Sequence, residues 1–417
     1  MIVTLAIAGV ALLAILVRPF RIAEFWWAVL GALALVLAGR LPFGAAWAAV
    51  LRGADVYLFL LGMLLLAEVL RTQGVFERLA VLALRAAGAS QLRLFGLVFL
   101  VGTGVTVFFS NDATAVVLTR AVATALGRTR VSPYPYLFAC AFVANAASFV
   151  LPISNPANLV VFGGALPRLG AWVSAFWLAS IVAVVLTFAV LLVGHWRRLS
   201  GSLVLASSGD APDRLGAASR AERVATVACG LAALGMVAAS LFGWPLGACA
   251  FGFALAAFAA VCLVERGAFV AVPREIDYGI VPLVAGLFVI VAALDRAGGA
   301  AALRAGFAHA FALGVPSGGI VAGAALALAC NAINNLPVGL GVASAFSGDG
   351  ASLTALRHAA LVAIDLGPNF AVSGSLATLL WMDALRRADV AMDAPRFLRS
   401  GVAVALPALL AALAIVR

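Results

Sequence analysis

The sequence contains no lysine, and only 11% of its 417 residues are charged. The missing lysine excludes a Walker-type phosphate loop, which needs GxxxxGK followed by Ser or Thr. Any energy-driven process would therefore draw on an ion gradient or on a separate ATPase subunit. The five cysteines stand apart in apolar sequence without CxxC spacing, which indicates neither a disulfide framework nor a zinc site.

Apolar residues are abundant: they make up 65% of the chain and give a mean hydropathy of +1.15. Soluble domains are on average roughly half apolar and a quarter charged. Uncharged stretches run over 131–167, 224–264 and 305–348, and each is long enough for one or two crossings of about 20 residues. These runs are continuous and not alternating, which disfavours a β-barrel. The sequence therefore predicts an all-α polytopic membrane protein.

We expect about ten transmembrane helices of the usual length of about 20 residues. The expected spans are 2–17, 22–39, 55–70, 134–164, 171–194, 223–242, 246–264, 279–295, 355–386 and 397–416. The first span lacks a basic leader and an A-x-A cleavage site before its end at Arg18 and Pro19. We therefore expect a retained helix and not a removable signal.

Two of these spans carry helix-breaking residues in their middle. The fourth contains LPISNPAN (151–158) and the ninth contains DLGPNFAVSGS (365–375), so both are expected to be broken helices. Before each comes a hydrophobic segment that we expect to fold back as a re-entrant hairpin. These segments are 93–127, around FSNDAT, and 316–346, around NAINNLP.

The same order of features occurs twice, which predicts an internal repeat. Residues 1–194 and 223–417 each give three spans, a more polar amphipathic stretch (74–90 and 297–312), a hairpin, a broken span and a closing span. The alignment pairs SNDAT (110–114) with NNLPV (334–338) and places Ser154 opposite Ser373. With five crossings in each half, the second half must be inverted relative to the first, as in many secondary transporters.

All 27 cations are arginines, and their distribution predicts the topology. If the N-terminus is outside, 19 arginines fall on the inner side and 7 on the outer side, with Arg120 left out. Cytoplasmic loops of membrane proteins carry such an excess. Both termini are then outside and 195–222 is a cytoplasmic linker. The same topology accounts for the net charge of +10, so nucleic acid need not be a partner.

Broken backbone at membrane depth is tolerated only inside protein or beside water, so the four interruptions predict a shared wet cavity near the midplane. Half-helix N-termini, Asn and Ser would supply neutral donors and acceptors there, which suits a small hydroxylated solute. Asp112 is the strongest single candidate, because intramembrane carboxylates are usually functional. It would carry a coupling proton or position a ligand, or it would only cap the second hairpin helix. Asp365 has the same two readings.

The polar residues around these acids also have two readings. The asparagines at 111, 155, 158, 334, 335 and 369 either tie off freed backbone groups or contact a ligand, and their matched positions in both halves favour a site. Cys330 lies one turn before Asn334. Contact of its thiol with a soft ligand is open, but simple packing is the more common role of such a cysteine.

Several motifs together resemble one family. FFSNDATAVVLT, LFACAFVANAASFVLPISNPANLV, the NNLP turn and DLGPNFAVSGSLATLLW are similar to the arsenical pump membrane proteins, arsenite/antimonite efflux permeases of the ion transporter superfamily. The resemblance covers both halves. It implies a bacterial inner-membrane protein that extrudes arsenite and antimonite, driven by the membrane potential and proton gradient, without a cofactor or metal site. It also implies that a cytoplasmic arsenite-stimulated ATPase can associate with the protein.

The resemblance implies site residues motif by motif. They are Ser110, Asn111, Asp112 and Thr114; Ser154, Asn155, Pro156 and Asn158; Asn334, Asn335 and Pro337; and Gly367, Pro368, Asn369, Ser373 and Ser375. Proton coupling is assigned to Asp112 and Asp365. Asp365 is a departure from the family pattern, in which a neutral residue, commonly Asn, precedes LGPN.

Other functions compete with this reading. Arsenite is mostly an uncharged trihydroxide at neutral pH and matches a polar, nearly charge-free cavity, but silicic or boric acid would match it as well. Sodium/proton exchangers should show more intramembrane carboxylates, whereas a sodium-coupled dicarboxylate carrier could use the same hairpins. A passive channel is a second class, which inverted repeats disfavour. A membrane enzyme would need a nucleophile–base–orienter set or a metal cluster, and neither is recognisable here.

Overall fold

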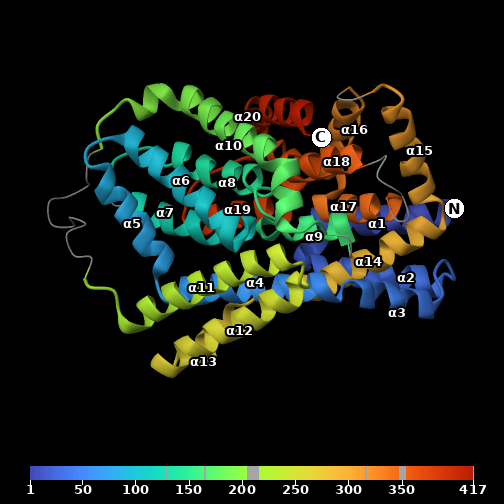
Figure 1. The fold of residues 1–417 in the computed structure, drawn as a ribbon, viewed down its shortest axis with the longest axis horizontal. Coiled ribbons are helices and arrows are strands. Elements are labelled where there is room, and N and C mark those ends of the chain that lie inside the picture. The colour runs from blue at the N-terminus through green and yellow to red at the C-terminus, as the bar shows by residue number, and fades with distance from the viewer. Residues whose placement is uncertain (128, 164–165, 204–215, 315–316, 347–353, 417) are drawn as a thin grey trace.

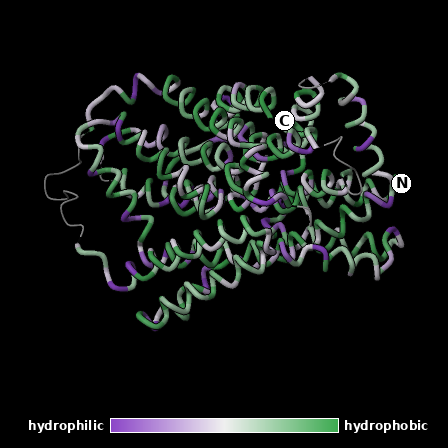
Figure 2. Tube along the Cα trace, in the orientation of Figure 1, coloured by the Kyte–Doolittle hydropathy of each residue, from purple (hydrophilic) through white to green (hydrophobic). Residues whose placement is uncertain are grey.

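The computed structural model describes the whole chain except residues 128, 164–165, 204–215, 315–316, 347–353 and 417. Arg128, Arg214, Arg417 and the middle of the predicted linker therefore lie outside the described residues. The described part is all-helical, as the apolar runs predict, and its only β pairing is an isolated bridge between Ser90 and Ser202. Figure 2 shows that most helices are hydrophobic along their length, with the hydrophilic residues mainly near helix ends.

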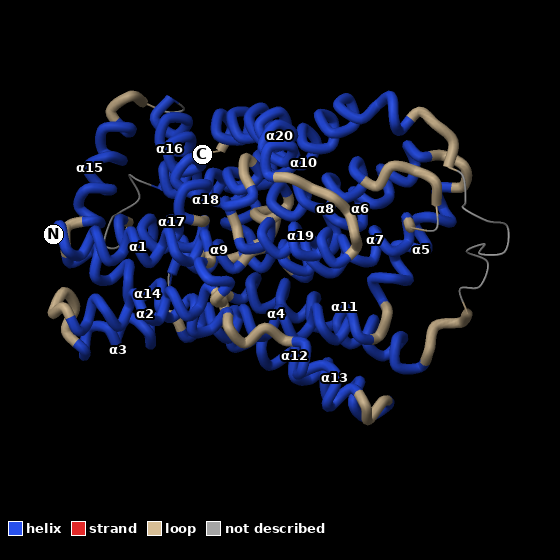
Figure 3. Tube along the Cα trace, turned by 180° about the vertical axis from the view of Figure 1, so that it is seen from behind, coloured by secondary structure: helices blue, strands red, loops and turns tan. Residues whose placement is uncertain are grey.

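The helices form two layers, each built from both halves of the chain (Figures 1 and 3). The first layer holds the opening helices of each half: α1 (Ile2–Val17), α2 (Glu24–Leu37), α3 (Phe43–Arg52), α4 (Ala54–Thr72), α11 (Arg220–Phe242), α12 (Leu246–Val264), α13 (Ala268–Glu275) and α14 (Ile280–Arg296). The second layer holds the rest: α5 (Val75–Ala87), α6 (Gln91–Phe109), α7 (Thr119–Leu126), α8 (Tyr134–Ala146), α9 (Pro156–Phe162), α10 (Leu169–Leu199), α15 (Gly299–Phe311), α16 (Ser317–Ile333), α17 (Asn335–Ala345), α18 (Thr354–Leu366), α19 (Leu376–Arg387) and α20 (Ala394–Ile415).

The expected spans agree with helices or helix pairs to within a few residues at most ends. Two helices, α3 and α13, were not expected, because short helices next to a longer span leave no separate apolar run. In the described part of the chain, six helices are long and apolar enough to cross a membrane, with α13 and α14 counted together as one of them, or seven if α3 and α4, bent by 44°, also count as one span. The count of ten therefore stays a prediction, since it depends on short helices such as α1 and on the two broken spans.

Glycine lets the first layer pack closely. A Cβ atom on Gly62 of α4 would lie 2.6 Å from the backbone carbon of Ala250 in α12, and one on Gly247 would lie 1.9 Å from the backbone oxygen of Asp55. Small residues of this kind allow close approach of membrane helices, which gain stability from van der Waals contact.

Replacing Gly62 with valine is therefore expected to lower the stability of the folded protein. The side chain would meet backbone atoms that cannot rotate away, and overpacking of this kind costs about 1–3 kcal/mol. Thermal unfolding in detergent measures the effect. Gly252→Val is the control, because a Cβ atom there meets nothing within 4 Å. Equal melting temperatures for the two variants would show that the contact is not tight.

Both predicted hairpins and both predicted breaks are present. The first hairpin is α6, a tip at Ser110, helical residues 111–112 that continue into a π-helical turn over Ala113–Leu118, and α7; the second is α16, a tip at Asn334, and α17. The breaks separate α8 from α9 and α18 from α19. The predicted amphipathic stretches are α5 and α15, which lie at opposite ends of the molecule (Figure 1). The order of features thus repeats, and the inverted relation of the halves stays a prediction.

Ion pairs gather at the end of the molecule where α5 lies, which we call the linker end. Arg71 pairs with Glu275 at 3.4 Å, and Arg78 of α5 pairs with Glu222 of α11. The sequence places both arginines on the inner side of the membrane. The linker end is therefore the predicted cytoplasmic end, and the orientation itself stays a prediction.

Candidate functional site at the meeting of the broken helices

The two hairpin tips share one unusual backbone turn. Ser110 has φ 94° and ψ 158°, and Asn334 has φ 76° and ψ 155°. Positive φ is uncommon outside glycine and is strained for a serine, so it persists where the surrounding structure requires it. A helix begins directly after each tip. The alignment of SNDAT with NNLPV therefore pairs residues with the same local conformation.

The two breaks also match in conformation. Leu151 and Asn155 are extended in the first break, and Ala371 and Ser375 are extended in the second. Each break ends on a helix cap: the Asn155 side chain accepts from the Ala157 amide at 3.0 Å, and Ser375 accepts from the Thr378 amide at 3.2 Å. The caps are typical of helix N-termini and satisfy backbone donors that a break exposes.

Ser154 and Ser373 make equivalent hydrogen bonds, in keeping with their alignment. Ser154 donates its hydroxyl to the Val107 carbonyl at 3.0 Å, and Ser373 donates to the Asn331 carbonyl at 2.7 Å. Each carbonyl lies three residues before the hairpin tip of its own half. Each break is thus held to the hairpin that precedes it. The helix caps correspond with a shift of one residue, because they match Asn155 with Ser375, whereas the alignment matches Ser154 with Ser373.

The breaks of the two halves meet each other through side chains. Asn155 donates to Asp365 Oδ1 at 2.8 Å, and Asn145 donates to Asn369 Oδ1 at 2.9 Å. Asn369 in turn donates to the Phe142 carbonyl at 3.1 Å. We call Asn145, Asn155, Asp365 and Asn369 the central polar layer, and none of the four is more than 3% exposed.

The central polar layer leaves hydrogen-bonding capacity unused. Oδ1 of Asn145 and Oδ2 of Asp365 are buried and accept no hydrogen bond within the described part of the chain. Buried polar atoms without a partner are rare and costly, and each calls for an explanation such as a ligand or an ion. Each of these two oxygens can therefore accept a hydrogen bond from a further donor.

Asp112 does not cap the second hairpin helix. Its side chain makes no capping bond, and the Ala113 amide instead lies 3.5 Å from the Ser110 hydroxyl. The carboxylate is half-buried, and none of the described residues forms a hydrogen bond or ion pair with it. Thr114 is fixed differently, because Thr106 donates to its hydroxyl at 2.8 Å. Of the readings open for Asp112, capping is wrong, and the functional ones stay predictions.

Some predicted site residues serve the backbone. Asn158 donates to three carbonyls of the first break, at 2.9 Å for Ser148 and 3.3 Å for two others. Gly367 lies against α16, since a Cβ atom there would stand 2.7 Å from the Ala327 Cα atom. Cys330 is fully buried, and the described chain contains no group of three or more Cys, His, Asp or Glu side chains that could hold a metal. The packing reading of Cys330 therefore fits the structure.

Asn111 and Asn335 behave differently from these. They occupy the matched residue directly after each tip, and both are nearly buried. Neither side chain hydrogen-bonds to any residue that the structure describes, and Oδ1 of Asn111 is completely buried. Contact of these two amides with a solute stays a prediction.

Asn145 and Asn331 were not predicted as site residues. Asn331 donates to the Gly367 carbonyl at 2.7 Å and accepts from the Ala371 amide at 2.8 Å, so it holds the second break to the second hairpin. Asn145 belongs to the central polar layer. The available signal was a single amide inside an otherwise apolar helix, since polar residues within membrane spans face the bundle interior and find partners there.

Two cavities touch the hairpins and breaks, but neither is lined by a residue of the central polar layer. A small one of about 20 Å³ touches Asn334, and a large one of about 700 Å³ is lined by Leu159 and Val160 of α9 but by none of the predicted site residues. A single wet cavity shared by all four interruptions therefore stays a prediction. In the structure, hydrogen bonds connect the four interruptions. Each hairpin is bonded to the break of its own half, and the two breaks are bonded to each other.

The chain matches the family model described as a citrate transporter, CitMHS, over residues 10–364. It is 26% identical over 426 residues to an arsenical pump membrane protein of Escherichia coli, a match that covers 98% of this chain and 96% of that protein. An arsenical pump membrane protein of Yersinia enterocolitica is 27% identical over 370 residues, covering 85% of this chain and 84% of that protein. The predicted resemblance to arsenical pump membrane proteins is thereby confirmed. The chain belongs to the citrate transporter family, CitMHS, as a membrane transporter similar to the arsenical pump membrane proteins.

Proposed function

We propose that the protein extrudes arsenite and antimonite as neutral trihydroxides, coupled to the proton-motive force by alternating access of two inverted halves. The observation that carries the proposal is the central polar layer, in which amides and one carboxyl group from both halves meet in a buried place. Amides and hydroxyls both donate and accept hydrogen bonds, as a trihydroxide requires. The names of several relatives that match almost the whole chain, arsenical pump membrane proteins, support the same substrate.

The charge of the layer favours a neutral solute over the citrate in the family's description. Citrate carries several negative charges, and buried anions need paired cations or many donors. The central polar layer and both hairpin tips contain no arginine, and the chain has no lysine. Asp112 and Asp365 would instead repel an anion. A neutral hydroxy acid avoids this repulsion.

The two carboxyl groups supply the proposed coupling. Asp365 is 0% exposed and has no cation beside it in the described structure, so its ionised form would be an unpaired buried charge. Such a charge is costly at membrane depth, and intramembrane carboxylates commonly take part in proton relays. Asp112, without a partner at the hairpin tip, is placed to exchange a proton with solvent or solute. We propose that these two groups couple proton entry to solute release.

Replacing Asn331 or Asn335, which are four residues apart, should distinguish an effect on solute binding from an effect on folding. Asn335→Leu is expected to weaken arsenite binding by about five- to tenfold, because a hydrogen-bonded contact worth roughly 1–1.5 kcal/mol is lost, with little change in stability. Asn331→Leu should instead lower the melting temperature, because two backbone groups of the second break lose their partner. Binding to the purified protein and thermal unfolding measure the two effects. Unchanged affinity in Asn335→Leu would make that amide structural.

Uphill transport tests the proposed mechanism. Everted membrane vesicles energised by respiration should accumulate arsenite, and a protonophore should abolish the accumulation. Equilibration without accumulation would indicate a passive channel. Antimonite, silicic acid, boric acid and citrate serve as competitors. Competition by antimonite alone supports the proposed substrates, whereas equal competition by silicic acid would indicate a broader hydroxy-acid carrier.

A further inference from the structure

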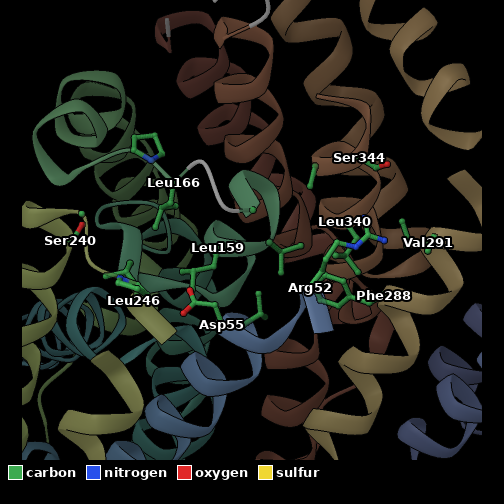
Figure 4. A pocket seen from close by; sticks show the side chains of 18 of the residues that line it. Arg52, Asp55, Leu159, Leu166, Ser240, Leu246, Phe288, Val291, Leu340 and Ser344 are labelled. Atoms are coloured by element: carbon green, nitrogen blue, oxygen red, sulfur yellow. The ribbon is translucent and has the colours of Figure 1, made fainter. Parts of the chain in front are cut away.

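The large cavity lies between the two layers of helices (Figure 4). Its volume of about 700 Å³ would hold roughly twenty waters, at about 30 Å³ each. Arg52 and Asp55, at the bend between α3 and α4, face Leu340 and Leu159 across it. The lining is mainly apolar, with Arg52, Asp55 and Asp295 as its charged side chains, and a space of this size can admit water.

The cavity touches the ends of α4 and α11 that lie away from the linker end. Asp55 is in the first turn of α4, whose last turn carries Arg71, and Ser240 is in the last turn of α11, whose first turn carries Glu222. The cavity also touches Asp295 at the end of α14. Ser344, in the last turn of α17, donates to Asp295 across the cavity wall. The wall thus joins a first-layer helix to the second hairpin.

The cavity also reaches the neighbourhood of the central polar layer. Leu159, one of its lining residues, directly follows Asn158 in α9, whose cap is Asn155. The seven residues of α9 span only about 10 Å at 1.5 Å per residue. A solute bound at the layer is therefore about one short helix away from water on this side.

Much less free space lies beside the tip of the second hairpin. The small cavity of about 20 Å³ next to Asn334 has room for about one water and is walled by apolar side chains such as Leu283 and Leu379. Arg18 also lines it, and its guanidinium lies 3.2 Å from Glu24 and 3.9 Å from Asp383 of α19. Arg18 thereby connects the end of α1 in the first layer with the second broken helix.

We propose that the structure is an outward-open state in which the large cavity is the vestibule for solute release and the ion pairs of Arg18 close the inner side. The inference rests on alternating access in the proposed function but not on the identity of the solute. When the second hairpin and the second broken helix move relative to the first layer, the Ser344–Asp295 hydrogen bond and the Arg18–Asp383 ion pair must break, because both join the first layer to the moving elements. Arg18 thus favours the outward-open state.

Thiol accessibility tests this assignment. In a chain whose five cysteines are replaced by alanine, Ala343→Cys and Ala292→Cys place a thiol in the vestibule, and Leu379→Cys places one at the closed side. A membrane-impermeant thiol reagent should label both vestibule positions in right-side-out vesicles at least about tenfold faster than Leu379→Cys in everted vesicles. If the cysteine-free chain does not fold, the same positions are compared in the native chain after subtraction of its own labelling.

The role of Arg18 is tested in the same vesicles. Arg18→Gln should raise labelling of Leu379→Cys in everted vesicles and lower labelling of Ala343→Cys. Arg21→Gln is the control, because Arg21 shares the positive φ of Arg18 and forms no ion pair in the described structure. Labelling of Leu379→Cys as fast as Ala343→Cys, or vestibule labelling only in everted vesicles, would overturn the proposal. Labelling as expected together with failed arsenite transport would instead reject only the proposed substrate.

Discussion

Asp112→Asn is expected to abolish uphill arsenite efflux, with the initial rate falling by at least about tenfold, equivalent to about 1.4 kcal/mol. The amide keeps the size of the side chain at the hairpin tip but cannot carry a proton. Folding should be unaffected, because the carboxylate makes no hydrogen bond or ion pair within the described residues. Efflux is measured by arsenite accumulation in everted vesicles at several pH values, and folding by the melting temperature.

The control for Asp112 is Asp389→Asn. Asp389 is exposed, has a φ of 54° that asparagine tolerates well, and lies outside both breaks. Its replacement should leave efflux and stability unchanged. If Asp112→Asn retains uphill efflux with the pH dependence of the unmodified protein, Asp112 is not the proton carrier, and the coupling would have to rest on Asp365 alone.

Asn155→Leu is expected to destabilise the folded protein by about 1–3 kcal/mol and to stop efflux, because it removes the donor to Oδ1 of buried Asp365. Asp365→Leu should have a similar effect by leaving the Asn155 amide unpaired. The double replacement removes both polar groups, and it is therefore expected to be more stable than the sum of the single losses predicts. Thermal unfolding of the four proteins measures the coupling energy.

This cycle separates stability from function. The double variant should recover much of the lost stability and still transport no arsenite, because the central polar layer is no longer polar there. Ser174→Ala, an exposed change on α10, serves as the control and should stay within about 0.5 kcal/mol of the unmodified protein. Strictly additive losses would show that Asn155 and Asp365 do not interact across the two halves.

The positions of the hairpins and breaks could be predicted from sequence because Pro, Gly and Asn inside apolar runs leave few alternatives in a membrane. The helices α5 and α15 could also be predicted, because each is a more polar stretch between apolar segments. The helix α3 could not be predicted, since it continues the apolar pattern of α4 across a bend. Short helices such as α1 leave the number of crossings a prediction for the same reason: length alone does not decide them.

The site could be predicted only as a set of residues. Asn155 and Asp365 are 210 residues apart in sequence, and no local pattern indicates which amide meets which carboxyl group. The positive φ of Ser110 arises from the hairpin as a whole, and it lets Ser110, and not Asp112, face the Ala113 amide. Asn331 was missed because its partners, in the second break, come close only in the folded chain.

Locating arsenic in the protein is the most direct measurement of whether a solute binds where the broken helices meet. An experimental structure of the arsenite-loaded protein, with arsenic found by its anomalous scattering, should show one arsenic peak coordinated by oxygen, with those oxygens within hydrogen-bonding distance of Asn155, Asp365 or Asn369. A peak bonded to the sulfur of a cysteine, or none at these residues in a protein that still transports arsenite, would contradict the account.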